Sequence, residues 1–338
     1  MFNIFFKGDD FIMKKFLALA LAMVMCLALV ACGTPAEVET PTDATEVTTY
    51  NVGICQLVQH VALDAATQGF KDVLSEKLGD KVVFDEQNAS GDSVACATIV
   101  NKFVSDEVDL ILANATPALQ SAAAATMTTP ILGTSITEYG VALECEVTDG
   151  VVPGNISGTS DLAPLDQQVE VLVELFPEAK KVALLYCSAE ANSKFQVTEV
   201  AKYLEAKAIE SKEFPFADSN DLAAVTEAAC AYADVIYVPT DNTVASSTGV
   251  IDGICRPAKK PVVAGEEGIC SDCGVATLSI DYYKLGRVTG EQAYRILVEG
   301  EDVNTMPIEY DQDVVKKYNA EICAELGVEV PADYIVIE

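Results

Sequence analysis

A set of mostly polar side chains lies at the carboxyl ends of predicted strands or directly after them, near the points where helices are expected to begin. Hydroxyl, amide and carboxylate groups in such places can hold a ligand without reacting with it, because helix N-termini add N–H donors that point outward. The chemistry that these residue types indicate is therefore noncovalent binding. The candidate binding residues are Gln56, Leu57, His60, Asn114, Thr116, Thr134, Ser135, Thr137, Asp241, Asn242, Glu266 and Asp281.

The chain offers little that could support catalysis. His60 is the only histidine, and the sequence has no Gly-x-Ser-x-Gly, no Gly-Lys-Ser/Thr phosphate loop and no His-Glu-x-x-His. Cys270-Ser-Asp-Cys273 is spaced like a redox or zinc pair, but a second pair or a nearby histidine is lacking. We therefore predict a protein that is not an enzyme and uses no metal or cofactor. An exported thiol enzyme using Cys270 and Cys273, or a hydrolase using His60, is the competing hypothesis.

The elements that carry these side chains include one stretch that is written twice. Residues 109–125 and residues 234–250 align without a gap. In each copy an Asp precedes four apolar residues, which are too few for a helix but suit a parallel strand buried on both faces. A polar turn and a helical run follow, and Pro117 suits the first position of the first of these helices. The chain thus contains two βα units of one design.

Strand and helix patterns alternate along the rest of the chain. This alternation predicts an α/β fold of doubly wound parallel sheets with helices on both faces. The predicted strands span residues 50–58, 81–85, 110–113, 131–133, 182–186, 213–216, 235–238, 261–264 and 274–280, and the predicted helices span residues 62–78, 94–104, 118–127, 165–176, 193–206, 222–232, 283–298 and 312–326.

Chain length indicates the number of domains, and net charge excludes some classes of binding partner. The 338 residues suffice for about two domains. A formal net charge of −31 argues against nucleic acid, polyanionic substrates and anionic membrane surfaces as partners of the folded part. Solubility alone would explain the same charge.

An export signal is predicted from Met13 onward. Lys14 and Lys15 precede an apolar run that is shorter than the roughly 20 residues of a membrane-spanning helix. Residues 1–12 do not fit a signal, so we predict that translation starts at Met13. Residues 33–48 are rich in Thr, Glu, Pro and Ala and are predicted to form a flexible tether.

Cysteine is frequent for an exported chain. Of the eleven cysteines, nine follow Cys32, and an odd number cannot form a complete set of disulfides within one chain. Several fall inside predicted strands or helices, where a free cysteine acts as a small apolar residue. Two alternatives are considered for Cys270 and Cys273: a disulfide within a loop, or two free thiols without a function.

Several motifs, taken in order, resemble one known family, the solute-binding lipoproteins of ATP-binding-cassette importers of the tryptophan- and tyrosine-binding type. Leu29-Val-Ala-Cys32 also resembles the lipobox of bacterial lipoproteins, which implies that Cys32 is lipidated. The resemblance covers residues 50–331. Its motifs are Gly53-Ile-Cys-Gln-Leu-Val-Gln-His, Ala62-Leu-Asp, Ala115-Thr-Pro-Ala, Gly154-Asn-Ile-Ser-Gly-Thr-Ser-Asp, Tyr237-Val-Pro-Thr-Asp-Asn-Thr-Val, Ala264-Gly-Glu-Glu-Gly and Ile280-Asp-Tyr-Tyr-Lys-Leu-Gly.

The resemblance implies a periplasmic-binding-protein type I fold, with two lobes around a ligand cleft and three crossings, near Ser160, Asp281 and Pro307. The implied division is a signal with lipobox at 1–32, a tether at 33–48, an N-terminal lobe at 49–159 plus 282–306, and a C-terminal lobe at 160–281 plus 307–338.

The resemblance also implies a function. The lobes would close around a small ligand, expected to be an aromatic amino acid, and deliver it to an ABC permease. The protein would be a monomer, lipid-anchored at Cys32 to the outer face of the cytoplasmic membrane. A ligand-sensing lobe pair of a membrane receptor is the alternative.

An amino-acid ligand presents a carboxylate, an ammonium and a side chain. Asp241 is the predicted partner of the ammonium, although it could instead cap a helix. His60 is predicted to face the same cleft, or else to be a surface or capping residue. The remaining assignments are the hydroxyls of Thr116, Thr134, Ser135 and Thr137 for the carboxylate, Glu266 and Asp281 as further acids, and Leu57 and Tyr139 as apolar walls.

Overall fold

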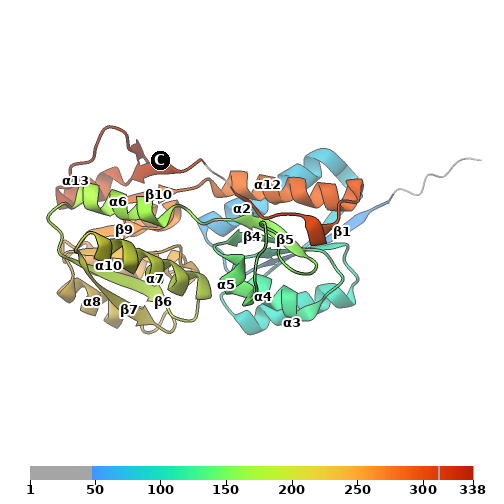
Figure 1. The fold of residues 1–338 in the computed structure, drawn as a ribbon, viewed down its shortest axis with the longest axis horizontal. Helices are drawn as coiled ribbons and strands as arrows, with labels where there is room; N and C mark the ends of the chain where they lie inside the picture. Colours follow the sequence, from blue (N-terminus) through green and yellow to red (C-terminus); the bar gives the residue numbers. More distant parts are fainter. Residues whose placement is uncertain (1–47, 311–312, 338) are drawn as a thin grey trace, which may run out of the picture. The chain divides into compact units, whose positions relative to one another are not determined.

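The computed structural model describes residues 48–310 and 313–337. The predicted signal, Cys32 and the whole tether except Thr48 lie outside these residues. Within the described part, no helix is long and apolar enough to cross a membrane. The strands form two sheets, and we call each sheet with the helices that cover it a lobe (Figure 1). Both lobes belong to one unit that begins at Thr48.

The first lobe contains a six-stranded sheet. Its strands are β1 (Tyr50–Gln56), β2 (Val82–Asn88), β3 (Leu110–Asn114), β4 (Ile131–Ile136), β5 (Ile156–Ser160) and β11 (Glu309–Tyr310), and its helical segments are α2 (Val61–Leu78), η1 (Gly79–Lys81), α3 (Ser93–Ser105), α4 (Thr116–Ala125), α5 (Tyr139–Leu143), α12 (Tyr282–Tyr294), η2 (Arg295–Glu299) and η3 (Val303–Thr305). The strand order is β11-β5-β4-β3-β1-β2, and every pair is parallel.

Alternate residues of the central strands pack on opposite faces of this sheet. Leu110 and Leu112 of β3 join the apolar cluster of α2 and α12, whereas Ile111 joins the cluster of α3 and α4. Figure 1 shows these two helix layers on either side of the sheet. Burial on both faces explains why the sequence of β3 is apolar without interruption.

The second lobe contains a seven-stranded sheet. Its strands are β6 (Lys181–Cys187), β7 (Glu210–Phe216), β8 (Val235–Val238), β9 (Val262–Ala264), β10 (Ala276–Ser279), β12 (Val315–Tyr318) and β13 (Ile335–Val336), and its helices are α6 (Leu165–Leu175), α7 (Ala191–Ala206), α8 (Leu222–Tyr232), α9 (Asn242–Ala245), α10 (Thr248–Cys255), α11 (Glu267–Cys273) and α13 (Ala320–Leu326). The strand order is β13-β12-β10-β9-β8-β6-β7.

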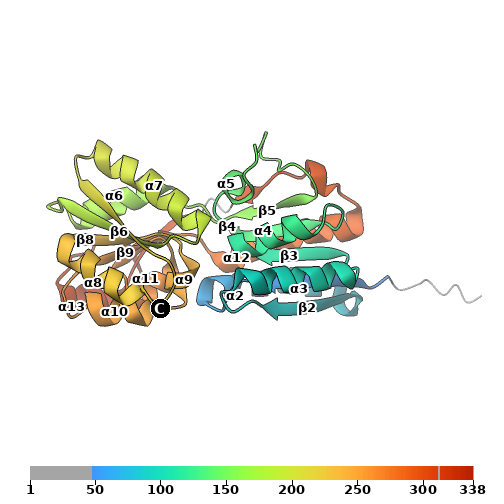
Figure 2. The ribbon, with the colours of Figure 1, turned by 90° about the horizontal axis from the view of Figure 1, so that it is seen from below.

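The second sheet is also buried on both faces. Val182 and Leu184 of β6 pack with α6 and α7, and Ala183 and Leu185 pack with α8 and α10; Figure 2 shows these helices on opposite sides of the strands. All described pairs in this sheet are parallel except β10 with β12. The predicted α/β class, with two parallel-dominated sheets, is confirmed.

The repeated stretch folds as a strand and a helix in both lobes. Its first residue has the same role in each copy: Asp109 Oδ2 accepts the backbone N–H of Asn51 at 2.7 Å, and Asp234 Oδ2 accepts that of Lys181 at 3.0 Å. Each carboxylate thus ties the third strand of its lobe to the start of the first. The copies differ afterwards, since α4 is continuous whereas α9 has only four residues before α10 begins.

Helix α12 returns from the second sheet to pack along α2 (Figure 1). Two glycines permit this contact. A Cβ on Gly286 would lie 1.9 Å from the carbonyl oxygen of Ala66, and a Cβ on Gly69 would lie 2.2 Å from that of Tyr283. The chain passes between the sheets after β5, before α12 and after β11. Because β11 pairs with β5, this last passage follows Tyr310 rather than Pro307.

The predicted helix over residues 312–326 is wrong before Asn319 and confirmed after it, where α13 lies. Strand β12 occupies part of it and pairs antiparallel with β10. Helix α13 begins only after Asn319, whose side chain accepts the N–H of Ile322 at 3.1 Å. The β-branched residue Val315 suits a strand, and β12 lies in the sheet between β13 and β10 and pairs with both. This pairing outweighs the helical periodicity of the sequence.

Candidate functional site

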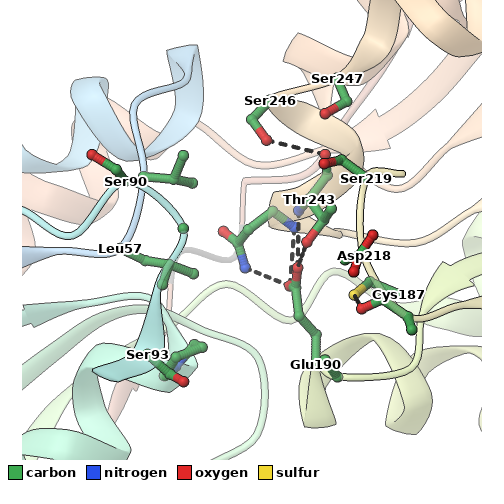
Figure 3. Close-up of a pocket in the computed structure, with 16 residues that line it drawn as sticks. Leu57, Ser90, Ser93, Cys187, Glu190, Asp218, Ser219, Thr243, Ser246 and Ser247 are labelled. Carbon is green, nitrogen blue, oxygen red and sulfur yellow. Dashed lines mark hydrogen bonds between the residues drawn. The ribbon is translucent and has the colours of Figure 1, made fainter. Parts of the chain in front are cut away.

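A cavity of about 270 Å³ lies at the carboxyl ends of strands from both sheets. We call it the interlobe cavity. In Figure 3, Leu57, Ser90 and Ser93 of the first lobe face Glu190, Cys187 and Thr243 of the second. The lining residues are Leu57, Val58, Ser90, Gly91, Ser93 and Pro117 from the first lobe, and Cys187, Ala189, Glu190, Ala217, Asp218, Ser219, Asn242, Thr243, Ser246 and Ser247 from the second.

The first wall is built from the loops that follow β1 and β2. The backbone N–H of Gly91 donates to the carbonyl oxygen of Leu57 at 2.8 Å, so the two loops hold each other. Ser90 and Gly91 both adopt positive φ, 54° and 83°, which turns the chain sharply into α3. Asp92 caps this helix by accepting the N–H of Val94 at 2.7 Å. Ser93, in the first turn, is thereby presented to the cavity.

The second wall is organised by Glu190. Its Oε1 accepts the backbone N–H and the hydroxyl of Thr243 at 2.9 and 2.7 Å. Its Oε2 accepts the backbone N–H and the side-chain amide of Asn242 at 3.0 and 2.7 Å, and the amide of Asn192 at 3.3 Å. The first N–H groups of a helix lack intrahelical acceptors, and Glu190 supplies them for α9.

Asp241 lies behind this wall. Its Oδ1 accepts the N–H of Val244 at 2.9 Å and its Oδ2 that of Cys187 at 2.7 Å. Burial, together with the negative charge of Glu190, raises the pKa of Asp241 to about 8. The side chain is only 1% exposed. Of the two roles considered for Asp241, the structure shows the helix cap, and this residue does not line the interlobe cavity.

His60 bridges the two lobes. Its Nε2 lies 3.3 Å from Oδ1 of Asn242. Because the amide oxygen of Asn242 can only accept, Nε2 of His60 carries the proton and donates it. Burial lowers the pKa of His60, against the opposing effects of its hydrogen bond to Asn242 and of the charge on Glu190. A neutral imidazole is consistent with this contact.

The charges of the interlobe cavity have one sign. Glu190 and Asp218 are the ionisable carboxylates among its lining residues, and no lysine or arginine is among them. Oδ1 of Asp218 accepts the N–H of Asn220 at 2.8 Å. The opposite wall contributes the hydroxyls of Ser90 and Ser93 at the start of α3. Hydroxyl groups therefore line both walls, whereas both carboxylates lie on the second wall.

Gln56 and Asn114 form an internal network instead of lining the cavity. Thr67 of α2 donates its hydroxyl to Oε1 of Gln56 at 2.7 Å and accepts the amide of Asn114 at 2.9 Å. Gln56 also donates to Oδ1 of Asp64 at 2.6 Å. These bonds fix the start of α2 to the ends of β1 and β3.

The predicted hydroxyl group around β4 is buried and does not line the interlobe cavity. Thr134 meets the hydroxyl of Thr159 at 3.3 Å, and the carbonyl oxygen of Thr137 accepts the hydroxyl of Ser160 at 2.9 Å. Ser135 has a φ of 56°, and its hydroxyl oxygen has no partner among the described residues. Thr116 is buried in the first turn of α4.

Glu266 and Asp281 line a second cavity, of about 330 Å³. Both are helix caps: Glu266 accepts the N–H groups of Gly268 and Ile269 at 2.6 and 2.5 Å, and Asp281 accepts that of Lys284 at 3.0 Å. Burial raises the pKa of Glu266 to about 7. The sequence-predicted acids are thus divided between different places.

Leu57 and Asn242 are the predicted residues that line the interlobe cavity, and His60 contacts Asn242. Sequence reasoning missed Glu190, Asp218 and Thr243. A signal for Glu190 existed, because Ser188-Ala-Glu-Ala-Asn-Ser follows the strand β6 as the other candidates follow theirs. The short segment after β7 places Asp218 in the same way.

The Cys270-Ser-Asp-Cys273 motif lies in helix α11 rather than a loop. Both thiols are buried and free, and burial raises the pKa of each. Buried thiols with raised pKa are poor nucleophiles. In the part of the chain that the structure describes, no group of three or more His, Cys, Asp or Glu side chains could hold a metal ion.

The chain is similar in sequence to a protein family and to a characterised relative. A family model described as "ABC transporter substrate binding protein" matches residues 51–337. A tyrosine-binding protein of Clostridioides difficile is 38% identical over 264 residues, which cover 76% of this chain and 75% of that protein.

Two solved structures are similar in fold and sequence. One is an ABC domain from Streptococcus pneumonia in complex with L-Trp, with a TM-score of 0.82, 31% identity and coverage of 86% of this chain and all of that one. The other is the ligand-free, open structure of a substrate-binding protein with adhesive properties from Clostridium difficile, with a TM-score of 0.67, 36% identity and coverage of 86% and 99%.

Proposed function

Because the chain belongs to the ABC transporter substrate-binding protein family, we propose that it captures an aromatic amino acid in the interlobe cavity and delivers it to a membrane permease. The relatives that bind tyrosine or L-Trp support this choice of ligand. The proteins of this family are binding proteins, and the buried thiols of Cys270 and Cys273 give no support to a thiol enzyme.

The observation that carries the proposal is the opposed chemistry of the two cavity walls. The start of α3, with Ser90 and Ser93, offers hydroxyls and helix N–H groups to a carboxylate. Glu190 and Asp218 offer negative charge to an ammonium, and no lining cation competes with the ligand. A zwitterion fits this arrangement better than a sugar or an anion does.

Apolar contacts would hold the ligand side chain. Leu57, Val58 and Pro117 lie on the first wall, and Ala189 and Ala217 on the second. The cavity volume of about 270 Å³ is close to the lower end of the roughly 300–1,000 Å³ usual for ligand pockets. This size favours one amino acid over a peptide or an oligosaccharide.

Lobe closure is the proposed mode of capture. The TM-score is higher with the L-Trp complex than with the ligand-free open structure, 0.82 against 0.67, although sequence identity with the complex is lower. This supports an arrangement of the described lobes like that around a captured ligand. The contact between His60 and Asn242 would then help to hold the lobes together.

The setting of the protein is part of the proposal. Proteins of this family are extracellular or periplasmic. Leu29-Val-Ala-Cys32 and the polar stretch after it support a tether through a lipid on Cys32 to the outer face of the cytoplasmic membrane. A lipid-labelled Cys32 at the N-terminus of the mature protein would be found by mass spectrometry of the membrane fraction.

The ligand can be tested by thermal unfolding of residues 34–338, after unfolding and refolding to remove bound solute. A ligand at 100 times its dissociation constant adds about 2.7 kcal/mol, which raises the midpoint visibly. We expect shifts with L-tryptophan, L-tyrosine or L-phenylalanine, and none with tryptamine or indole-3-propionate, which lack the carboxylate or the ammonium. No shift with any amino acid would refute the proposal.

A further inference from the structure

The thiols of Cys230 and Cys255 face each other across two neighbouring helices. Their sulfur atoms are 3.5 Å apart, although 25 positions separate the residues in the chain. Cys230 belongs to α8 and Cys255 ends α10, and the two helices pack on the same face of the second sheet (Figure 2). We propose that these two cysteines are a disulfide site that closes in the compartment where the protein works.

The surroundings favour reaction at Cys230. The thiol of Cys255 and the positive charge of Lys260 lower the pKa of Cys230. Lys260 is held in place because its ammonium donates to the carbonyl oxygen of Ala233 at 2.6 Å and its backbone N–H donates to that of Cys255 at 2.9 Å. A thiolate beside a cation is the nucleophilic form of cysteine, so Cys230 attacks first and Cys255 resolves.

None of the other described thiols named here combines a facing thiol, a nearby cation and partial exposure. Cys270 and Cys273 are buried with raised pKa, and Cys323 donates its thiol to the carbonyl oxygen of Val275 at 3.2 Å. Cys55 and Cys96 also lie against each other, and Cys55 lowers the pKa of Cys96, but both are fully enclosed in the first lobe. Cys230 is 7% exposed, close enough to the surface for a small oxidant to arrive after a slight opening of α8.

The reaction needs a disulfide-containing oxidant such as oxidised glutathione. The Cys230 thiolate attacks one sulfur of the oxidant and releases the first thiolate. Cys255 then gives its proton to the released thiolate and attacks the Cys230 sulfur of the mixed disulfide, and the second thiolate leaves and takes a proton from water. The two cysteines are oxidised by two electrons and the oxidant is reduced by two. Extracellular and periplasmic compartments favour this direction.

The bond would close a loop that carries part of the interlobe cavity. Strand β8 and helix α9 lie between the two cysteines, with Asn242 and Thr243 of the second wall. A cross-link over this segment restricts the unfolded chain and so favours the folded one. The site holds whether or not the amino-acid ligand is correct, because it rests on the helices and not on the cavity.

The experiment uses residues 34–338, exported and purified without reductant, then incubated in oxidised glutathione. Free thiols are alkylated before digestion, and the peptides are mapped with and without reduction. We expect one linked species joining the peptides of Cys230 and Cys255, and a midpoint of thermal unfolding that falls when reductant is added. Alkylation of both cysteines after oxidation, or a link from Cys255 to Cys273, would overturn the proposal.

Two variants separate the disulfide from general effects of thiol loss. Cys230→Ser should abolish both the linked species and the effect of reductant on the midpoint. Cys323→Ser removes a buried thiol of the same lobe and should keep both. If Cys230→Ser folds poorly, the alkylation map of the wild-type protein still decides. An equal effect of reductant on wild type and Cys230→Ser would place the sensitivity elsewhere.

Discussion

Glu190 accepts both the backbone N–H and the hydroxyl of Thr243, at 2.9 and 2.7 Å, and so holds the start of α9 against the end of β6. One of the two carboxylates of the second wall thus also fixes the shape of that wall. Helix α9 has four residues and little stability of its own. We expect the wall to depend on this one carboxylate.

Glu190→Gln tests that dependence. An amide keeps one acceptor and sets its NH₂ group against N–H donors of Asn242 or Thr243. Leaving buried donors unsatisfied costs about 1–3 kcal/mol, so we expect a lower midpoint of urea unfolding and an affinity for the amino acid reduced about tenfold or more. Glu205→Gln, exposed on α7, is the control and should change neither.

The pH dependence of stability should report on Asp241. Its pKa is raised from 3.8 to about 8 in the folded protein, so between these values the folded state holds a proton that the unfolded state releases. Its contribution to stability is therefore lost as the pH rises through this window. Urea unfolding at several pH values should show a smaller fall for Asp241→Asn than for wild type. Glu266, shifted in the same direction, would leave part of the slope.

The control for this measurement is Asp218→Asn, since Asp218 is exposed and lies in the same lobe. Its curve should run parallel to that of wild type. Parallel curves for Asp241→Asn and wild type across pH 4 to 8 would contradict the assignment of the raised pKa.

The glycine contact between α2 and α12 predicts a large effect of one methyl group. In Gly286→Ala the new Cβ would lie 1.9 Å from the carbonyl oxygen of Ala66. This oxygen belongs to the backbone of α2, so relieving the clash requires the two helices to move apart. Overpacking of this kind costs typically about 1–3 kcal/mol, which exceeds the helix-propensity gain of up to about 1 kcal/mol.

Gly253→Ala on α10 is the matched substitution. Nothing lies within 4 Å of its added Cβ, so it should raise the free energy of unfolding slightly. Equal effects of the two substitutions would show that α2 and α12 do not meet through their backbones.

Ala115 precedes α4 with a φ of 87° and a ψ of 156°, a region of backbone space that only glycine occupies without strain. Such strain costs of order 1–3 kcal/mol. Ala115→Gly should therefore keep or raise the free energy of unfolding, whereas Ala118→Gly, inside α4, should lower it. A loss of stability in Ala115→Gly as large as that in Ala118→Gly would argue against the strained backbone.

The sequence predicted the fold where local pattern and tertiary environment agree. The apolar runs of β3 and β8 had to be buried on both faces, and their repeated Asp marked equivalent positions in both lobes. The prediction of a helix directly after residue 312 was wrong, because β12 is a strand through its pairing with β10. No local sequence pattern shows this pairing.

The site was harder to predict than the fold. The sequence pattern predicted that Asp241 follows a strand. It did not show that both carboxylate oxygens accept backbone N–H groups, from Val244 and Cys187. Glu190 was missed because it lies 52 positions before Asn242 in the chain and reaches the same wall from another loop. Which polar residue faces a cavity and which caps a helix is decided by three-dimensional neighbours.

The measurement that tests the central claim most directly is a calorimetric titration of refolded residues 34–338 with L-tryptophan and L-tyrosine. Wild type is compared with Ser93→Arg, which would fill the interlobe cavity, and with Met127→Arg, at a residue that is 87% exposed and outside it. We predict binding to wild type and Met127→Arg, with affinity reduced at least about a hundredfold in Ser93→Arg. Equal affinity in all three proteins would show that the ligand binds elsewhere, and heat from none of them would refute amino-acid capture.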